Sequence, residues 1–123
     1  MQIIKDKKII EDLWVYVQDS DPVQEGDIIV SFARWQKDRA TLLNHKGNLG
    51  IRLGSEDSLE EIKDDFDRLN LIELEFPAFT DGRGFSQAWL LRNRFGYGGE
   101  LRAVGNFMLD QIFYLNRVGF NSF

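Results

Sequence analysis

Residues 76–120 read FPAFTDGRGFSQAWLLRNRFGYGGELRAVGNFMLDQIFYLNRVGF, and this stretch decides the fold. It contains the end of a strand, a polar loop with two glycines, a helix, a second strand and a second helix in direct succession. Strands that alternate with helices in this way predict a parallel sheet with helical crossovers. Ligands of such sheets usually bind at the carboxyl ends of the strands. We therefore expect an α/β fold with its site at one rim of the sheet.

Three further strands precede the polar loop. Residues 28–32 and 49–53 are nearly continuous apolar runs, which is typical of parallel strands that are covered on both faces. Residues 71–76 form the next candidate strand, in which two glutamates alternate with apolar residues. We predict an α/β domain over residues 24–123, with a mostly parallel sheet of βα units that is either a half-barrel or flavodoxin-like.

The amino-terminal residues predict a separate small β-ribbon. Residues 2–5 and 8–10 are short apolar runs on either side of a turn, and residues 14–17 are β-branched and aromatic enough to add a strand. Residues 18–22 are polar and turn-rich, as expected of a joint. We predict that residues 1–20 form a β-ribbon that packs on the main domain.

Composition narrows the functional class. The chain has 123 residues, which is the size of one domain, and it has no cysteine, so it has no disulfide, thiolate or iron–sulfur chemistry of its own. Twenty acidic against fifteen basic residues give a net charge of −5, which argues against a nucleic-acid partner. No apolar run has the length of a signal-peptide core or a membrane span. We expect a cytoplasmic protein that binds neither membrane nor nucleic acid.

Two glutamates in the strand over residues 71–76 are candidate catalytic groups. Glu73 and Glu75 are two residues apart, so their carboxylates lie on the same face of the strand. Two close carboxylates in a cleft have split pKa values and can act as acid and base. The alternative is that this face is exposed to solvent, or that the strand lies at an edge of the sheet.

The polar loop is the candidate anion site. Asp81 either caps the following helix or acts as an acid–base group. The amides of Gly82 and Gly84 at a helix start can bind an anion, Arg83 can add a bidentate fork, and Ser86 is included in the same candidate pocket. The loop matches neither GxGxxG nor the phosphate-binding GxxxxGK[ST]. A simple cap with turn glycines therefore remains the alternative.

The last predicted strand and helix contain three more polar residues that interrupt apolar runs. Arg102 interrupts an apolar strand, so it needs a partner or a wet cavity. It can form a structural salt bridge to Glu75 or Asp81, or it can bind an oxyanion. Asp110 and Gln111 interrupt the apolar run of the last helix, and they point either at the strand ends, where they support the site, or at solvent.

The sequence does not predict a metal site. Residues 58–61 fit a capping box, so we expect a helix there, and the seven acidic residues of 56–67 are expected on its solvated face. His45 is the only histidine, and it lies at a helix exit, where its charge suits the helix dipole better than it suits catalysis or metal binding.

These segments closely resemble the bacterial family called domain of unknown function 934. The resemblance rests on residues 72–79, 80–86, 99–105, 110–111 and 117–123, and it extends forward through 31–36 and 49–53 to the amino terminus. It implies an oxidoreductase-like protein encoded beside genes for sulfite reductase and sulfate assimilation, with no established reaction, catalytic residue or cofactor. Relatives usually continue beyond Phe123 with a closing strand and helix, and they often carry cysteine at Val118, which we interpret as a core position.

The residue patterns and the family resemblance together favour one functional hypothesis over two alternatives. The leading hypothesis is an accessory protein of assimilatory sulfite reduction that docks with the reductase and binds a small oxyanion. The predicted pocket consists of Asp81, Gly82, Arg83, Gly84, Ser86 and Arg102. The alternative is an oxidoreductase-like enzyme, with Glu75 or Asp81 as the acid–base group and Arg102 stabilising charge. A purely structural scaffold is the third class.

Overall fold

The computed structural model describes residues 2–6, 8–54, 56–76, 83–105 and 112–123. The strands are β1 (Gln2–Lys5), β2 (Lys8–Glu11), β3 (Val15–Tyr16), β4 (Ile28–Ser31), β5 (Leu49–Leu53), β6 (Leu71–Phe76) and β7 (Glu100–Gly105). The helices are α1 (Phe32–Leu43), the 3-10 helices η1 (Leu59–Glu61) and η2 (Lys63–Arg68), α2 (Arg83–Asn93) and α3 (Ile112–Val118).

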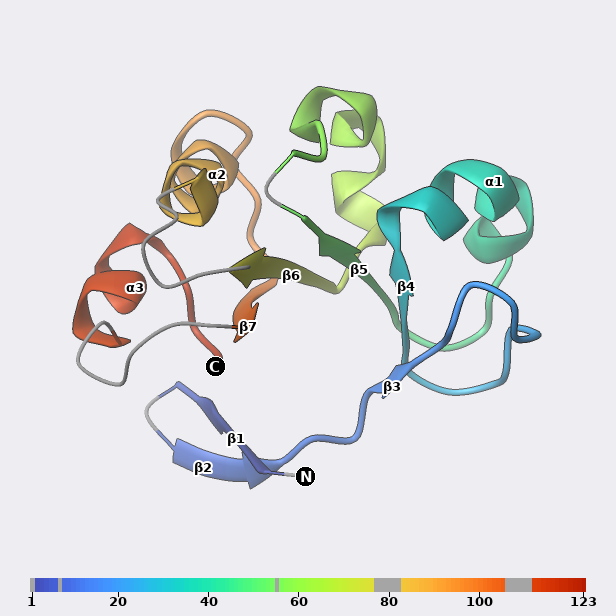
Figure 1. Cartoon of the computed structure of the whole chain (residues 1–123), viewed down its shortest axis with the longest axis horizontal. Helices are drawn as coiled ribbons and strands as arrows, with labels where there is room; N and C mark the ends of the chain where they lie inside the picture. Colours follow the sequence, from blue (N-terminus) through green and yellow to red (C-terminus); the bar gives the residue numbers. More distant parts are fainter. Residues whose placement is uncertain (1, 7, 55, 77–82, 106–111) are drawn as a thin grey trace.

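Strands β3 to β7 form a parallel sheet in the order β3-β4-β5-β6-β7, and β1 and β2 form an antiparallel ribbon. The sheet curls into a half-barrel, with the helices on its outer side and the ribbon facing its inner side (Figure 1). The predicted α/β fold is therefore confirmed, and of its two alternatives the structure shows the half-barrel. The hairpin at the amino terminus and the strands expected at residues 28–32, 49–53 and 71–76 are also confirmed, although the first of these strands ends at Ser31.

The hydrophobic core lies between the sheet and the helices. Alternate strand residues such as Val30, Ile51 and Leu74 point outward and belong to the same buried cluster as Trp35 of α1 and Leu91 of α2. The other set of alternate residues points to the inner side of the half-barrel. That inner side carries the charged groups of β5, β6 and β7.

The strand expected over residues 14–17 exists, but the structure places it outside the ribbon. Val15 pairs in parallel with Ile28, so β3 is the first strand of the main sheet. Apolar and β-branched composition predicts a strand without saying which strand it pairs with. The ribbon therefore contains only β1 and β2.

The carboxyl-terminal residues join the ribbon to the main sheet. The amide of Ile4 donates to the carbonyl of Phe123 (3.2 Å), and the amide of Phe123 donates back to Ile4 (2.8 Å). The amide of Ala103 donates to the carbonyl of Ser122 on the other side (3.0 Å). Residues 121–123 thus lie between β1 and β7, so backbone pairing continues from the β7 edge of the sheet to the ribbon.

The predicted capping box is wrong. Ser58 makes no side-chain capping bond, and two 3-10 helices replace the expected α-helix, with a break at Ile62. The acidic face is not wholly solvated either, because Asp65 is buried and accepts from Arg39 (2.6 Å) and Trp35 (3.3 Å). These contacts between distant segments outweigh the local helical preference.

Candidate functional site

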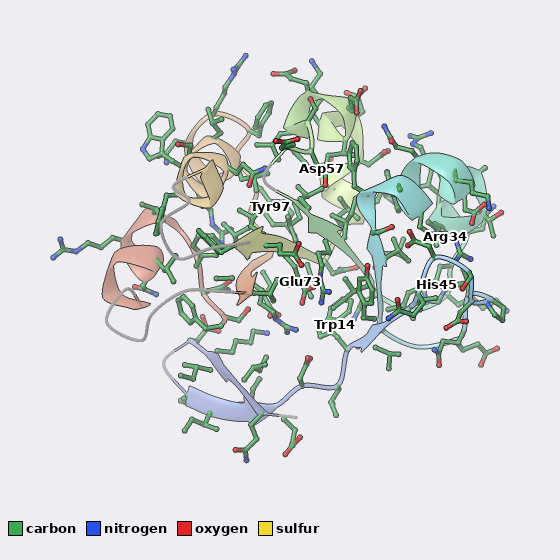
Figure 2. The ribbon with its side chains drawn as sticks, in the orientation of Figure 1. Trp14, Arg34, His45, Asp57, Glu73 and Tyr97 are labelled. Atoms are coloured by element: carbon green, nitrogen blue, oxygen red, sulfur yellow. The ribbon has the colours of Figure 1, made fainter. Side chains whose placement is uncertain are left out.

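Charged side chains line the inner face of the half-barrel. Arg52 of β5 is the register partner of Glu73 of β6, which is in turn the partner of Arg102 of β7. Glu75 follows Glu73 on the same face of β6, and Glu100 precedes Arg102 on the same face of β7. Figure 2 shows Glu73 on the side of the sheet that faces the ribbon. The two glutamates of β6 thus share the inner face of a strand that is not at an edge of the five-stranded sheet. Glu73 is buried, so it does not face solvent.

Arg102 is buried, and all three of its guanidinium nitrogens donate to protein groups. Its Nη1 donates to Asp12 (3.2 Å) and to Glu73 (3.4 Å). Its Nη2 donates to Glu100 (2.9 Å), and its Nε donates to the hydroxyl of Ser122 (3.3 Å). The salt bridge expected with Glu75 is instead made with Glu73, because the parallel register places Glu73 directly opposite. An anion that bound Arg102 would have to displace these groups.

Glu100 connects the ribbon and the carboxyl terminus to this cluster. Its carboxylate accepts from the hydroxyl of Ser122 (2.7 Å), from Lys5 of β1 (3.0 Å) and from Arg102. Burial raises the pKa of Glu100, but the bonds from Ser122, Lys5 and Arg102 outweigh it, so the net pKa is lowered. The carboxylate is therefore charged at neutral pH and holds both chain ends in place.

Arg52 differs from Arg102 because part of its guanidinium is not engaged. Its Nε donates to Glu73 (2.8 Å), and its guanidinium carbon lies 4.1 Å from the ring centre of Tyr16. Within the described part of the chain, no residue bonds to the two terminal nitrogens of Arg52. The side chain is 30% exposed. The bond to Glu73 and the contact with the Tyr16 ring thus fix the orientation of the guanidinium. Its two terminal nitrogens, which have no partner among the described residues, can donate to a ligand.

A cavity of about 320 Å³ lies at the carboxyl ends of β3 to β6, where the fold class predicts a site. It is lined by Tyr16, Asp19, Ser31, Phe32, Ala33, Arg52, Gly54, Asp57 and Glu75. We call it the Arg52 cavity. Burial raises the pKa of the Tyr16 phenol, and the positive charge of Arg52 opposes that rise only in part. Tyr16 is therefore a neutral hydrogen-bond donor at neutral pH.

Arg34 of α1 holds one wall of the Arg52 cavity. Its Nη1 donates to the carbonyls of Gln18 (3.2 Å), Asp19 (2.9 Å) and Asp21 (2.8 Å), so one buried guanidinium closes this loop. The hydroxyl of Ser31 caps α1 and donates to the Asp19 carboxylate (2.6 Å). The loop therefore carries Asp19 to the cavity in a fixed orientation.

Three of the predicted site residues line three different cavities. Glu75 lines the Arg52 cavity, whereas Arg102 lines a second cavity of about 250 Å³ that is shared with Arg52, Glu73 and Asp12. Ser86 lines a third cavity, between α2 and η1, and so lies apart from Arg102.

Gly84 is packed against Phe76 at the start of α2. Asp81, Gly82, Asp110 and Gln111 lie outside the described residues, and so does the side chain of Arg83. The structure therefore brings Glu75 to Arg52, while the predicted loop pocket remains a prediction.

Sequence reasoning missed Arg52, Tyr16 and Asp19. Arg52 interrupts an apolar parallel strand in the same way as Arg102, so the same rule could have found it. Tyr16 and Asp19 carry no such signal, since they were assigned to the ribbon and to its joint. Only the pairing of β3 with β4 brings them to the cavity.

The described residues show neither a metal centre nor a membrane segment. Within them, no group of three histidine, cysteine or acidic side chains could hold a metal ion. His45 follows α1, and its Nε2 lies 2.6 Å from the carbonyl of Gly26. Across the described ranges, no helix is long and apolar enough to cross a membrane.

The fold and the site define a class: an α/β half-barrel with a charged inner face and an arginine-containing cavity at the carboxyl ends of its strands. A family model described as "Bacterial protein of unknown function (DUF934)" matches residues 50–123. The chain belongs to this family, as the sequence resemblance suggested. No curated protein and no solved structure matches the chain.

Proposed function

We propose that this protein binds a small oxyanion in the Arg52 cavity and acts as a cytoplasmic accessory protein of assimilatory sulfite reduction. The observation that supports this most strongly is the half-engaged guanidinium of Arg52. Glu73 and Tyr16 hold it in place, and its two terminal nitrogens have no partner among the described residues. A planar guanidinium fork of this kind matches the geometry of oxyanions.

The pathway part of the proposal draws on the family. The resemblance implies genes for sulfite reductase beside those of the relatives, and sulfite is a small oxyanion of the kind that Arg52 can bind. An accessory protein also needs a docking surface. Trp89 of α2 is 55% exposed, and exposed tryptophans are frequent anchors of protein interfaces. We place the contact with the reductase on this face of α2.

Titration calorimetry with sulfite and with phosphate tests the anion site. We expect wild-type protein to bind and Arg52→Gln to lose most of the affinity, because the amide has one donor group and no charge. Arg94→Gln is the matched control, because Arg94 is an exposed arginine just after α2 that does not line the Arg52 cavity. Equal binding by the wild type and Arg52→Gln would remove the proposed site.

Co-purification of the tagged protein with sulfite reductase tests the accessory role. We expect the reductase to be retained by wild-type protein and released by Trp89→Ser, with Arg94→Gln behaving as wild type. A protein that runs alone, together with a reductase assay that does not respond to its addition, would contradict this role even if the anion site is real.

A second candidate function is an enzyme with Glu75 as the acid–base group. It is favoured by the position of Glu75, which is exposed in the same cavity as Tyr16 and Arg52. Arg52 would then stabilise developing charge in place of the saturated Arg102. Turnover with a nicotinamide or flavin cofactor that is lost in Glu75→Gln would establish this candidate. Turnover that Glu75→Gln retains would exclude Glu75 from the chemistry.

A further inference from the structure

We propose that the Arg52 cavity selects small oxyanions that still carry an O–H group, such as hydrogen sulfite and hydrogen phosphate, over fully deprotonated ones such as sulfate. The selectivity rests on the proposed anion site, and it adds which anions that site accepts. The residues that carry it are Arg52, which donates, and Glu75, which only accepts.

Arg52 and Glu75 lie on the neighbouring strands β5 and β6, on the same face of the sheet. Glu73 is the register partner of Arg52, and Glu75 lies two residues further along the same strand, toward its carboxyl end. Strand spacing and rise per residue place the Cα atoms of Arg52 and Glu75 roughly 8 Å apart. Both side chains line the same cavity. An anion held by the fork of Arg52 therefore meets the carboxylate of Glu75.

Among the described residues, Glu75 is the carboxylate in this cavity that has no hydrogen-bond or ion-pair partner. The Asp19 carboxylate accepts from Ser31 (2.6 Å), and the Asp57 carboxylate accepts from the amide of Gly54 (2.7 Å). A ligand in the cavity thus meets one acceptor that still requires a donor.

This arrangement discriminates between anions by their protons. An ionised carboxylate can accept a hydrogen bond but cannot donate one, so an unprotonated oxygen of the anion is repelled by Glu75. An O–H group on the anion turns that repulsion into a charge-assisted hydrogen bond. Sulfate has no proton to offer at neutral pH, whereas sulfite and phosphate are both partly protonated. The Tyr16 hydroxyl adds a neutral donor that serves either kind of anion.

Titration calorimetry of phosphate and sulfate at neutral pH, on wild-type protein and Glu75→Gln, tests the selectivity. These two anions have the same tetrahedral shape and differ in the O–H group. We expect wild-type protein to bind phosphate roughly 10- to 100-fold more tightly than sulfate, as the loss of a hydrogen bond to a charged group predicts. In Glu75→Gln the amide can donate, so the affinity for sulfate should rise toward that for phosphate.

A second experiment measures the affinities for sulfite and phosphate over a series of pH values. The affinity of wild-type protein for sulfite should fall as the pH rises and sulfite loses its only proton, whereas phosphate keeps an O–H group over this range and should still bind. Glu75→Gln should flatten the pH dependence for sulfite. Circular dichroism confirms that the variant is folded, and Arg94→Gln should keep the wild-type preference.

The outcomes separate the selectivity from the anion site itself. If wild-type protein binds phosphate and sulfate equally and Glu75→Gln changes neither, the selectivity is wrong and the anion site stands. If wild-type protein binds none of the three anions, the anion site and the selectivity are both wrong. If sulfate binds more tightly than phosphate, Glu75 does not face the ligand.

Discussion

Arg52 and Arg102 lie on the same inner face of the sheet, on either side of Glu73, and yet their chemistry differs. All three guanidinium nitrogens of Arg102 donate to protein groups, whereas among the described residues only the Nε of Arg52 has a hydrogen-bond partner. The sequence predicts that an arginine inside a parallel strand needs a partner or a wet cavity. It could not predict which partner, because Asp12 lies 90 residues away from Arg102 in the chain. Glu75 was found because strand periodicity alone sets its face.

Replacing Arg102 by methionine should destabilise the protein by about 3–5 kcal/mol, because three carboxylates would then face one another without their shared cation. Urea unfolding measures the change. The matched control is the exposed Arg94→Gln, which should stay within about 0.5 kcal/mol of wild type. A loss for Arg102→Met as small as that of the control would show that the cluster does not hold the fold together.

The lowered pKa of Glu100 predicts a pH dependence of stability. A carboxylate whose pKa is lowered on folding stabilises the protein above its ordinary pKa, 4.5, and loses this contribution as the pH falls through the folded value. Glu100→Gln should therefore cost about 2 kcal/mol at neutral pH, and the difference from wild type should shrink below pH 4.5. Chemical unfolding at several pH values measures it. A difference that is constant with pH would contradict the ionised cluster.

The contact between α2 and β6 shows how the elements are held together. We expected Gly84 to free the loop for anion binding, but a Cβ at this position would lie 2.5 Å from the ring of Phe76. That ring is buried and packs against Phe85 and Phe120, so it has little room to move. Strand and helix positions were predictable from periodicity, whereas this close approach and the 3-10 helices depend on tertiary packing.

Gly84→Ala should therefore destabilise the protein by about 1–3 kcal/mol, although alanine is the better helix former. Gly98→Ala is the matched control, because a Cβ there meets nothing within 4 Å. Thermal unfolding followed by circular dichroism compares the two. If Gly84→Ala is as stable as Gly98→Ala or more so, the close packing of α2 on β6 is wrong.

At the scale of the whole molecule, the amino-terminal ribbon faces the inner side of the half-barrel, and the carboxyl-terminal residues lie beside β7 (Figure 1). Backbone bonds from Ile4 to Phe123 and the ion pair of Lys5 with Glu100 attach the ribbon, and one edge of β2 has no strand partner among the described residues. The sequence predicted the ribbon and the sheet separately. It could not predict that residues 121–123 join them, because three residues carry no periodic pattern.

The rate of amide hydrogen exchange should differ between the central strands of the sheet and the ribbon. Amides of β4, β5 and β6 lie between paired strands and beneath helices, so we expect them to exchange slowest, while amides of β2 exchange much faster. Mass spectrometry of deuterium uptake measures both. Protection of β2 equal to that of β5 would show that the ribbon is an integral part of the sheet rather than an attached element.

The central claim, that Arg52 holds a small oxyanion, is tested most directly by a crystal structure with selenite, the heavier analogue of sulfite. Selenium scatters anomalously, so its position is found without interpreting the shape of the density. The prediction is an anomalous peak within hydrogen-bonding reach of the terminal nitrogens of Arg52, on the side of Glu75. A peak beside Ser86 and the preceding loop, with none at Arg52, would contradict it.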